Sequence, residues 1–132
     1  MLGGQVTVDA AALKKGLQSD GKIALYGIYF DTAKAVLKAE SKAQLDEIAK
    51  LLRQQPALKV YLVGHTDSEG GLDANLALSQ QRAQAVADAL IRQYQIDGKR
   101  LLARGVANLA PVASNDADAG RARNRRVELV VQ

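Results

Sequence analysis

Short β-prone runs alternate with helical patterns along the chain, and this alternation limits the folds that it can adopt. Residues 22–30 (KIALYGIYF) are rich in β-branched and aromatic residues, and their second half is apolar on both faces, as in an inner strand of a covered sheet. Ser41 and Gln44 form a capping box that predicts the start of a helix. Its buried stripe, at 3-4-3 spacing, consists of Leu45, Ile48, Ala49 and Leu52. Pro56 ends this helix, and residues 58–63 are a second predicted strand, which ends at a glycine.

The second half of the chain continues the same alternation. A helix follows Gly70-Gly71, and its predicted buried stripe consists of Leu76, Ala83, Val86, Ala87 and Leu90. Residues 100–106 and 126–131 are predicted strands, joined by an irregular connection at 107–124. Because no long helix separates these last two strands, we expect a mixed sheet. The predicted fold is an α/β (α+β) sandwich, with a mixed four-stranded sheet of βαβαββ type covered by helices.

A short strand-helix segment precedes this predicted core. Residues 5–8 are β-prone, and Asp9 occupies the N-cap position of a short helix that ends at the turn residue Gly21. The sequence therefore predicts an N-terminal extension at 1–21 and the main domain at 22–132.

The composition indicates one folded domain. At 132 residues, with 48% apolar and 24% charged residues, the chain can form a single core and does not resemble a disordered segment. No apolar run reaches the roughly 20 residues that cross a bilayer. The absence of cysteine excludes disulfides, thiolate metal ligands and cysteine nucleophiles. Residues 1–4 lack the basic start and apolar core of a secretory signal, so we expect any export signal or membrane anchor to lie outside this sequence.

Residues 64–82 (GHTDSEGGLDANLALSQQR) carry the most informative polar pattern. A polar loop follows the second predicted strand and leads into a helix that carries Asn75, Ser79 and Arg82 at intervals of four and three. These three side chains are expected within about 60° of one another on one flank of the helix, beside the buried stripe. Arg82 is then placed at the edge of the core with its head group free to bind, and Asp67 provides a carboxylate in the loop. A ligand with both an ammonium and a carboxylate would suit this pair.

Four sequence blocks occur in order along the chain: GHTDSEG at 64–70, NLALSQQRAQAV at 75–86, PVASN at 111–115 and GRARNRRVEL at 120–129. The stretch FDTAKAVL at 30–37 precedes them. Together they resemble the OmpA-like C-terminal domain family, the peptidoglycan-binding module of OmpA, peptidoglycan-associated lipoproteins and flagellar stator proteins. The order and spacing of all the blocks agree with that family.

The resemblance implies a periplasmic domain of an outer-membrane or envelope-anchored protein, which binds the meso-diaminopimelate residue of the peptidoglycan stem peptide without chemical change. In the family, the positions of Asp67 and Arg82 hold the ligand's ammonium and carboxylate, and Asn75 belongs to the same site. Secondary contacts are implied for Phe30, Asp31, Thr32, Arg121 and Arg125. The resemblance implies no catalytic residue, cofactor or metal, and a monomer or weak dimer.

The charge pattern of diaminopimelate agrees with this implication. Its free end is a zwitterion, and binding it requires one fixed anion and one fixed cation, each desolvated only when its partner arrives. Lysine lacks the second carboxylate, so a lysine-containing stem peptide would leave the Arg82 guanidinium unpaired. Arg82 is therefore also expected to select diaminopimelate over lysine.

Other interpretations of the same residues remain open at this point. Asp67 could cap the following helix, and Arg82 could be an ordinary surface arginine. His65, the only histidine, is expected to be a neutral, hydrogen-bonded ring that holds the loop. A wall-peptide hydrolase would need Ser68 or Ser79 beside that histidine. Zinc would need further histidine or thiolate ligands, which the chain lacks.

Two further alternatives concern the partner. The arginine-rich segment 121–126 raises nucleic acid as a partner, but one Phe and four Tyr supply few stacking platforms, so we expect no nucleic-acid binding. Arg121 and Arg125 could instead anchor the irregular connection through carbonyls and carboxylates. The third hypothesis is a protein-docking module that keeps the fold and has lost the ligand pocket.

Overall fold

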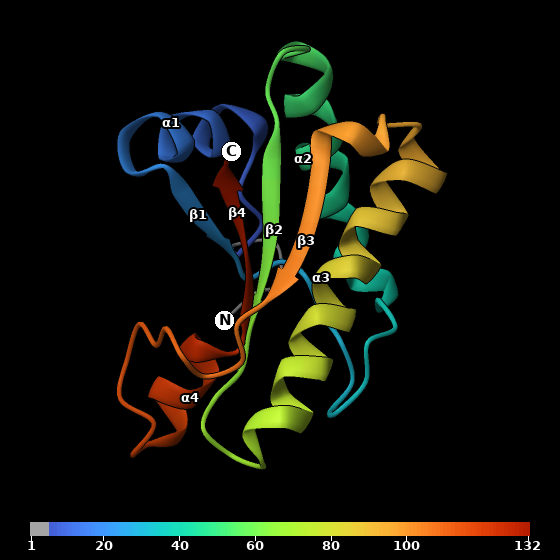
Figure 1. Cartoon of the computed structure of the whole chain (residues 1–132). Helices are drawn as coiled ribbons and strands as arrows, with labels where there is room; N and C mark the ends of the chain where they lie inside the picture. Colours follow the sequence, from blue (N-terminus) through green and yellow to red (C-terminus); the bar gives the residue numbers. More distant parts are fainter. Residues whose placement is uncertain (1–5) are drawn as a thin grey trace.

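The computed structural model describes residues 6–132 (Figure 1). The main elements are α1 (Ala10–Asp20), β1 (Lys22–Leu25), α2 (Lys42–Gln54), β2 (Val60–His65), α3 (Leu72–Tyr94), β3 (Leu101–Gly105), α4 (Asp118–Asn124) and β4 (Arg126–Val131), with short 3-10 turns η2 (Ala39–Ser41) and η3 (Gly98–Arg100). The strands form one sheet in the order β1-β4-β2-β3. Strands β2 and β3 are parallel, and β4 is antiparallel to both β1 and β2, so the predicted mixed four-stranded sheet is confirmed.

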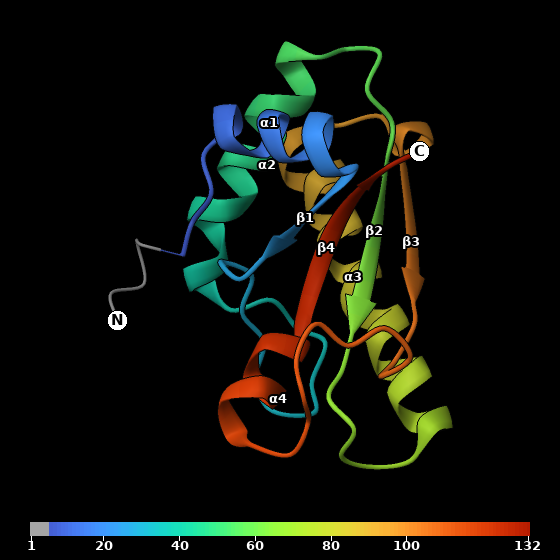
Figure 2. The same cartoon turned by 90° about the vertical axis from the view of Figure 1, so that its left-hand side faces the viewer.

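Helices α1, α2 and α3 share one core with the sheet (Figures 1 and 2). Alternate residues of the paired strands, such as Leu62 and Leu129, point into this core, and both are fully buried. The predicted α2 stripe of Leu45, Ile48, Ala49 and Leu52 is buried, as are Leu13 and Leu17 of α1. Helix α1 packs against α2 and β1 in the same core. The division into an N-terminal extension at 1–21 and a main domain at 22–132 stays a prediction.

The first predicted strand is shorter than expected. Strand β1 ends at Leu25, and it lies at the edge of the sheet, so the expectation of an inner strand over 22–30 is wrong. At Gly27 the chain passes so close to α2 that an added Cβ would lie 3.0 Å from Gln44 Oε1. Phe30 forms only an isolated antiparallel β-bridge with Leu37. The apolar residues after the strand therefore leave the sheet and become part of a loop.

The predicted capping box at the start of α2 is also wrong. The Ser41 hydroxyl accepts from Tyr29 N at 2.8 Å and donates to Tyr29 O, instead of capping the helix. The Gln44 side chain bonds both backbone groups of Val8. Residues 6–8 form no strand and are held to α2 through Val8, while Gln5 lies outside the described residues.

Smaller differences occur after β2. The strand continues through Gly64 to His65, because Gly64 still pairs with Gly105. The connection predicted as irregular contains helix α4, which sequence periodicity could not reveal because the helix has no apolar stripe. The Asn124 side chain accepts from Val112 N and Ala113 N and thereby attaches α4 to the preceding loop. In the described part of the chain, no helix combines the length and the apolar character needed to cross a membrane.

Candidate binding pocket

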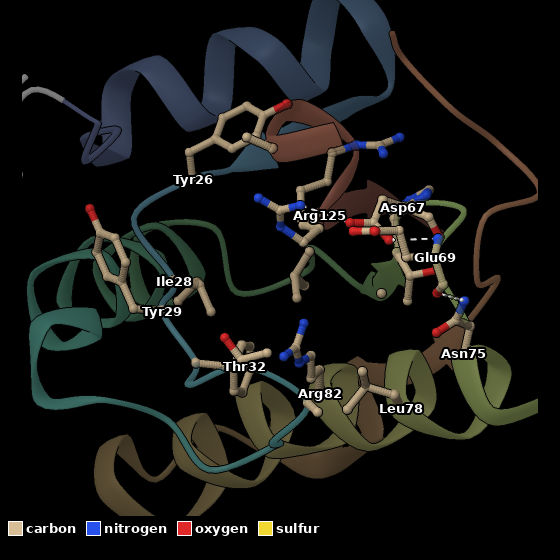
Figure 3. A pocket seen from close by; sticks show the side chains of 18 residues that line it. Tyr26, Ile28, Tyr29, Thr32, Asp67, Glu69, Asn75, Leu78, Arg82 and Arg125 are labelled. Carbon is tan, nitrogen blue, oxygen red and sulfur yellow. Dashed lines mark hydrogen bonds and ion pairs between the residues drawn. The ribbon is translucent and has the colours of Figure 1, made fainter. Parts of the chain in front are cut away.

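A pocket of about 750 Å³ opens at the carboxyl end of β2 (Figure 3). Its walls come from the loop after β1, the end of β2 with the loop that follows it (64–69), one flank of α3 and the junction of α4 with β4. The shortened β1 is what makes the first wall, because residues 26–33 turn away from the sheet and face α3. The pocket therefore combines segments that are distant in the sequence.

Asp67 is buried in this pocket and already has two partners. Its Oδ1 accepts from Glu69 N at 3.0 Å, which fixes the loop. Its Oδ2 accepts from Arg125 Nη1 at 2.7 Å. Asp67 does not cap α3, because the N-cap residue of that helix is Gly71 and no side chain bonds there. The carboxylate is therefore held at one oxygen by a backbone N–H group and at the other by the half-exposed side chain of Arg125.

Arg82 lies on the α3 flank of the same pocket. Its Nε donates to Lys34 O at 2.8 Å and its Nη2 to Asp31 O at 3.1 Å, so its head group is not free as predicted. The guanidinium also lies over the Phe30 ring, 5.0 Å from its centroid. Within residues 6–132 it makes no ion pair, and burial followed by the nearby charge of Arg125 lowers the pKa of Arg82, partly offset by Asp67. The negative charge of a ligand group beside the guanidinium would oppose both effects, because it favours the charged form of Arg82.

The other predicted site residues divide into two groups. Asn75, Phe30 and Thr32 line the pocket, and Asn75 Nδ2 also donates to Glu69 O at 2.9 Å. Asp31 does not line the pocket: its carbonyl accepts from Arg82, and its side chain is 67% exposed and lies near Lys38. Arg121 does not line the pocket. Its guanidinium bonds Asn115 O and the Asp118 carboxylate, which anchors the α4 connection as the structural interpretation proposed.

The predicted polar row on α3 is only partly correct. Ser79 is fully buried between α3 and the sheet, where its hydroxyl donates to Leu76 O and accepts from Ala107 N. It therefore does not face the ligand pocket with Asn75 and Arg82. Leu76, predicted as core, is only half buried. Gly64 and Gly105 have no side chains, so the sheet lies very close to α3 at Ser79. The buried face of α3 therefore includes Ser79.

Comparison with known proteins decides the family. The OmpA family model matches residues 29–125. This chain belongs to the OmpA family. The probable lipoprotein YiaD of Escherichia coli (strain K12) is 42% identical over 104 residues, which cover 79% of this chain and 47% of YiaD. The OmpA-family chain described here therefore spans less than half the length of that relative.

Two solved structures show the same fold as this OmpA-family domain. The cell wall anchor of the T6SS from Pseudomonas aeruginosa matches with a TM-score of 0.72 at 32% identity, over 96% of this chain and 97% of that chain. The peptidoglycan-associated lipoprotein from Burkholderia pseudomallei matches with a TM-score of 0.72 at 33% identity, over 80% and 88% of the two chains. The resemblance found in the sequence blocks and the predicted α/β fold are thus confirmed.

Sequence reasoning did not find two parts of the OmpA-family pocket. Tyr26, Ile28 and Tyr29 line its other end, since the end of β1 at Leu25 was not predicted. A buried charged cluster lies at its floor, where Arg126 Nε donates to Glu128 Oε2 at 2.8 Å. The only sequence signal for this cluster is the alternation of charged and apolar residues at 126–129 in the predicted last strand, which does not indicate that the charged residues pair with each other.

His65 belongs to the same floor and is not the hydrogen-bonded ring that we expected. Its Nε2 lies 3.5 Å from Glu128 Oε1, and neither ring nitrogen has a hydrogen-bond partner in the described part of the chain. Ser79 is bonded to backbone and Ser68 is exposed, so neither forms a pair with His65. The arrangement that a serine hydrolase needs is therefore not formed by these residues.

The fall of the free energy of unfolding at acid pH is expected to depend on the buried Glu128. The neighbouring His65 ring, and after it the bond and charge of Arg126, outweigh burial and lower the pKa of Glu128 from 4.5 to about 2. Because the folded-state pKa lies below the unfolded-state pKa, the stabilisation is complete above about pH 5 and is lost as the pH falls toward about 2. We expect Glu128→Gln to lower the free energy of unfolding at pH 7 by about 2 kcal/mol, since it also leaves Arg126 unpaired.

Urea unfolding measured from pH 7 down to pH 2 checks this expectation. The variant should show a much flatter dependence of stability on pH than the wild type between about pH 5 and pH 2. Glu40→Gln is the control, because Glu40 is an exposed glutamate whose nearest cation, on Lys38, lies 3.9 Å away. Parallel pH profiles for the wild type and Glu128→Gln would contradict the assignment.

Proposed function

We propose that this domain binds peptidoglycan non-covalently through the diaminopimelate residue of the stem peptide, and so anchors the outer membrane or an envelope complex to the cell wall. The observation that carries the proposal is that Asp67 and Arg82 line one pocket from two different elements. The ligand ammonium would bind the Asp67 carboxylate. The ligand carboxylate would bind the remaining N–H groups of Arg82, which has only carbonyl partners in the described structure.

The relatives support the same function. One similar structure is a peptidoglycan-associated lipoprotein, and another, matched over almost its full length, is the cell wall anchor of a secretion system. Because YiaD is a probable lipoprotein of about twice the matched length, a membrane anchor outside this sequence agrees with the proposal. We infer a periplasmic location, where the domain would reach the wall, and a binding role without catalysis.

Selectivity for diaminopimelate would come from Arg82. A lysine side chain supplies the ammonium for Asp67 but no carboxylate for the guanidinium. Arg82 would then stay half buried and without an anion, while burial and, after it, the charge of Arg125 lower its pKa. Lysine should therefore compete poorly with diaminopimelate for this pocket.

Sedimentation with purified sacculi tests the proposal. The wild type should pellet, and meso-diaminopimelate should release it at concentrations at which lysine does not. Arg82→Ala should lose at least about 30-fold in affinity, since truncating one member of a buried charge pair costs about 2 to 5 kcal/mol. Arg92→Ala is the matched control, because Arg92 is an exposed arginine of the same helix.

Two outcomes would count against the proposal. If the wild type stays in the supernatant, the domain does not bind the wall. If Arg82→Ala and Arg92→Ala pellet equally, the wall is bound elsewhere. Thermal unfolding of each variant is needed beside the binding data, because Arg82 also holds the backbone of Asp31 and Lys34.

A further inference from the structure

Arg125 occupies the place that the proposed ligand ammonium would take. Its Nη1 lies 2.7 Å from Asp67 Oδ2, while the other oxygen of Asp67 is held by Glu69 N. No other side-chain hydrogen bond holds Arg125 within residues 6–132. Its side chain is 48% exposed, against 10% for that of Asp67. The fixed member of this pair is therefore the carboxylate, and the guanidinium is the member that can leave.

Arg125 and Arg82 face each other across the pocket (Figure 3). The charge of Arg125 contributes to the lowered pKa of Arg82, which places the two guanidinium groups within electrostatic reach of each other. Arg126 is paired with Glu128 below them, so it does not add a free charge. The exposed Glu69 carboxylate lies toward Arg121. Two cations thus lie near one buried carboxylate, Asp67, and only Arg125 is paired with it.

The pocket is also larger than one amino-acid end group. Its volume of about 750 Å³ falls in the range of roughly 300 to 1,000 Å³ typical of sites for drug-sized ligands. In Figure 3, Arg125 lies between the Asp67 end of the pocket and the end with Tyr26 and Tyr29. A guanidinium that leaves Asp67 can therefore still contact a ligand that continues toward the tyrosines.

We propose that Arg125 is an exchangeable counter-ion: a ligand ammonium displaces it from Asp67, and the released guanidinium then binds a second carboxylate of the same ligand. This inference rests on the proposed function and specifies its ligand class. The ligand is a peptide with a zwitterionic end and a further carboxylate, as in the segment L-alanyl-γ-D-glutamyl-meso-diaminopimelate of a stem peptide. In this tripeptide, free carboxylates besides the zwitterionic end occur on the glutamyl residue and at the peptide-linked end of diaminopimelate.

Calorimetric titration with two peptides tests the exchange. One is the tripeptide L-alanyl-γ-D-glutamyl-meso-diaminopimelate, and the other is the same peptide with those two carboxylates amidated and the zwitterionic end intact. The wild type should prefer the first by about tenfold, the effect of a hydrogen bond between charged groups. In Arg125→Gln the preference should fall to about one, and the amidated peptide should bind more tightly than it does to the wild type, because Asp67 is no longer occupied.

Arg123→Gln is the matched control, since it removes one exposed arginine from α4, the helix directly before Arg125, outside the pocket. It should keep the wild-type preference. A preference that persists in Arg125→Gln, or an equal loss of affinity for both peptides, would overturn the inference. In either of these two cases, binding of both peptides to the wild type would leave the proposed function standing, and only the role of Arg125 would fail. Absence of binding of either peptide to the wild type overturns both.

Discussion

Replacing Asp67 by asparagine is expected to lower the affinity for meso-diaminopimelate by at least about 30-fold, the effect of a loss of 2 kcal/mol or more. Asparagine has nearly the same shape, and its side-chain oxygen can still accept from Glu69 N, so the loop should keep its conformation. The negative charge is lost, however. The ligand ammonium would then enter a pocket in which Arg82 and Arg125 are left without their buried anion.

Calorimetric titration of the wild type and the variant measures this effect. Asp116→Asn is the control, because it removes the same charge from an exposed loop position. Its affinity should equal that of the wild type. If Asp67→Asn binds diaminopimelate as tightly as Asp116→Asn does, the ammonium site is not at Asp67 and the proposed orientation of the ligand is wrong. Far-UV circular dichroism of both variants would show whether the fold is retained.

Replacing Gly64 by alanine should have the largest effect on folding. A Cβ at this position would lie 2.1 Å from the carbonyl oxygen of Ser79, which belongs to the α3 backbone and cannot rotate away. Gly105, the partner of Gly64 in β3, faces the same turn of α3, where its Cβ would lie 2.2 Å from Gln80 N. Helix and sheet would have to separate locally. We expect the free energy of unfolding to fall by about 3 kcal/mol or more.

Urea unfolding at pH 7 checks this expectation. Gly71→Ala is the control, since its Cβ would meet nothing within 4 Å and its φ of -77° suits any residue. As Gly71 is the N-cap of α3, the control should lose no more than about 1 kcal/mol. Equal stability of Gly64→Ala and Gly71→Ala would show that α3 does not pack on β2 as closely as described. The Gly64 variant should also bind ligand poorly, because Gly64 lines the pocket and α3 carries Arg82.

Local periodicity predicted most of the secondary structure. The final strand was predicted at 126–131 and is found there, and the α2 stripe is buried as predicted. The long helix after Gly70-Gly71 begins where the glycines predict it. These elements depend on side-chain spacing within a few turns or residues, which the sequence displays directly. Chain order then limited the topology, so the mixed sheet could be predicted as well.

The site was predictable to a smaller extent. The sequence blocks indicated Asp67 and Arg82, and the structure places both in one pocket. It also showed what no local pattern indicated: the contact of Arg125 with Asp67, and the two carbonyls that hold Arg82. Each of these contacts joins residues that are about fifty or more positions apart.

The sequence by itself indicated the family, most of the strands and helices in their order, and the opposite charges of Asp67 and Arg82 as the candidate binding pair. Only the tertiary structure decided that β1 ends at Leu25, that Ser79 packs against the sheet, and that Arg125 pairs with Asp67. The reason is that periodicity reports which face of an element is apolar, but not which distant backbone group or charge it will meet. Those partners are fixed by close packing between α3 and the glycines of the sheet, and by the loop that leaves β1.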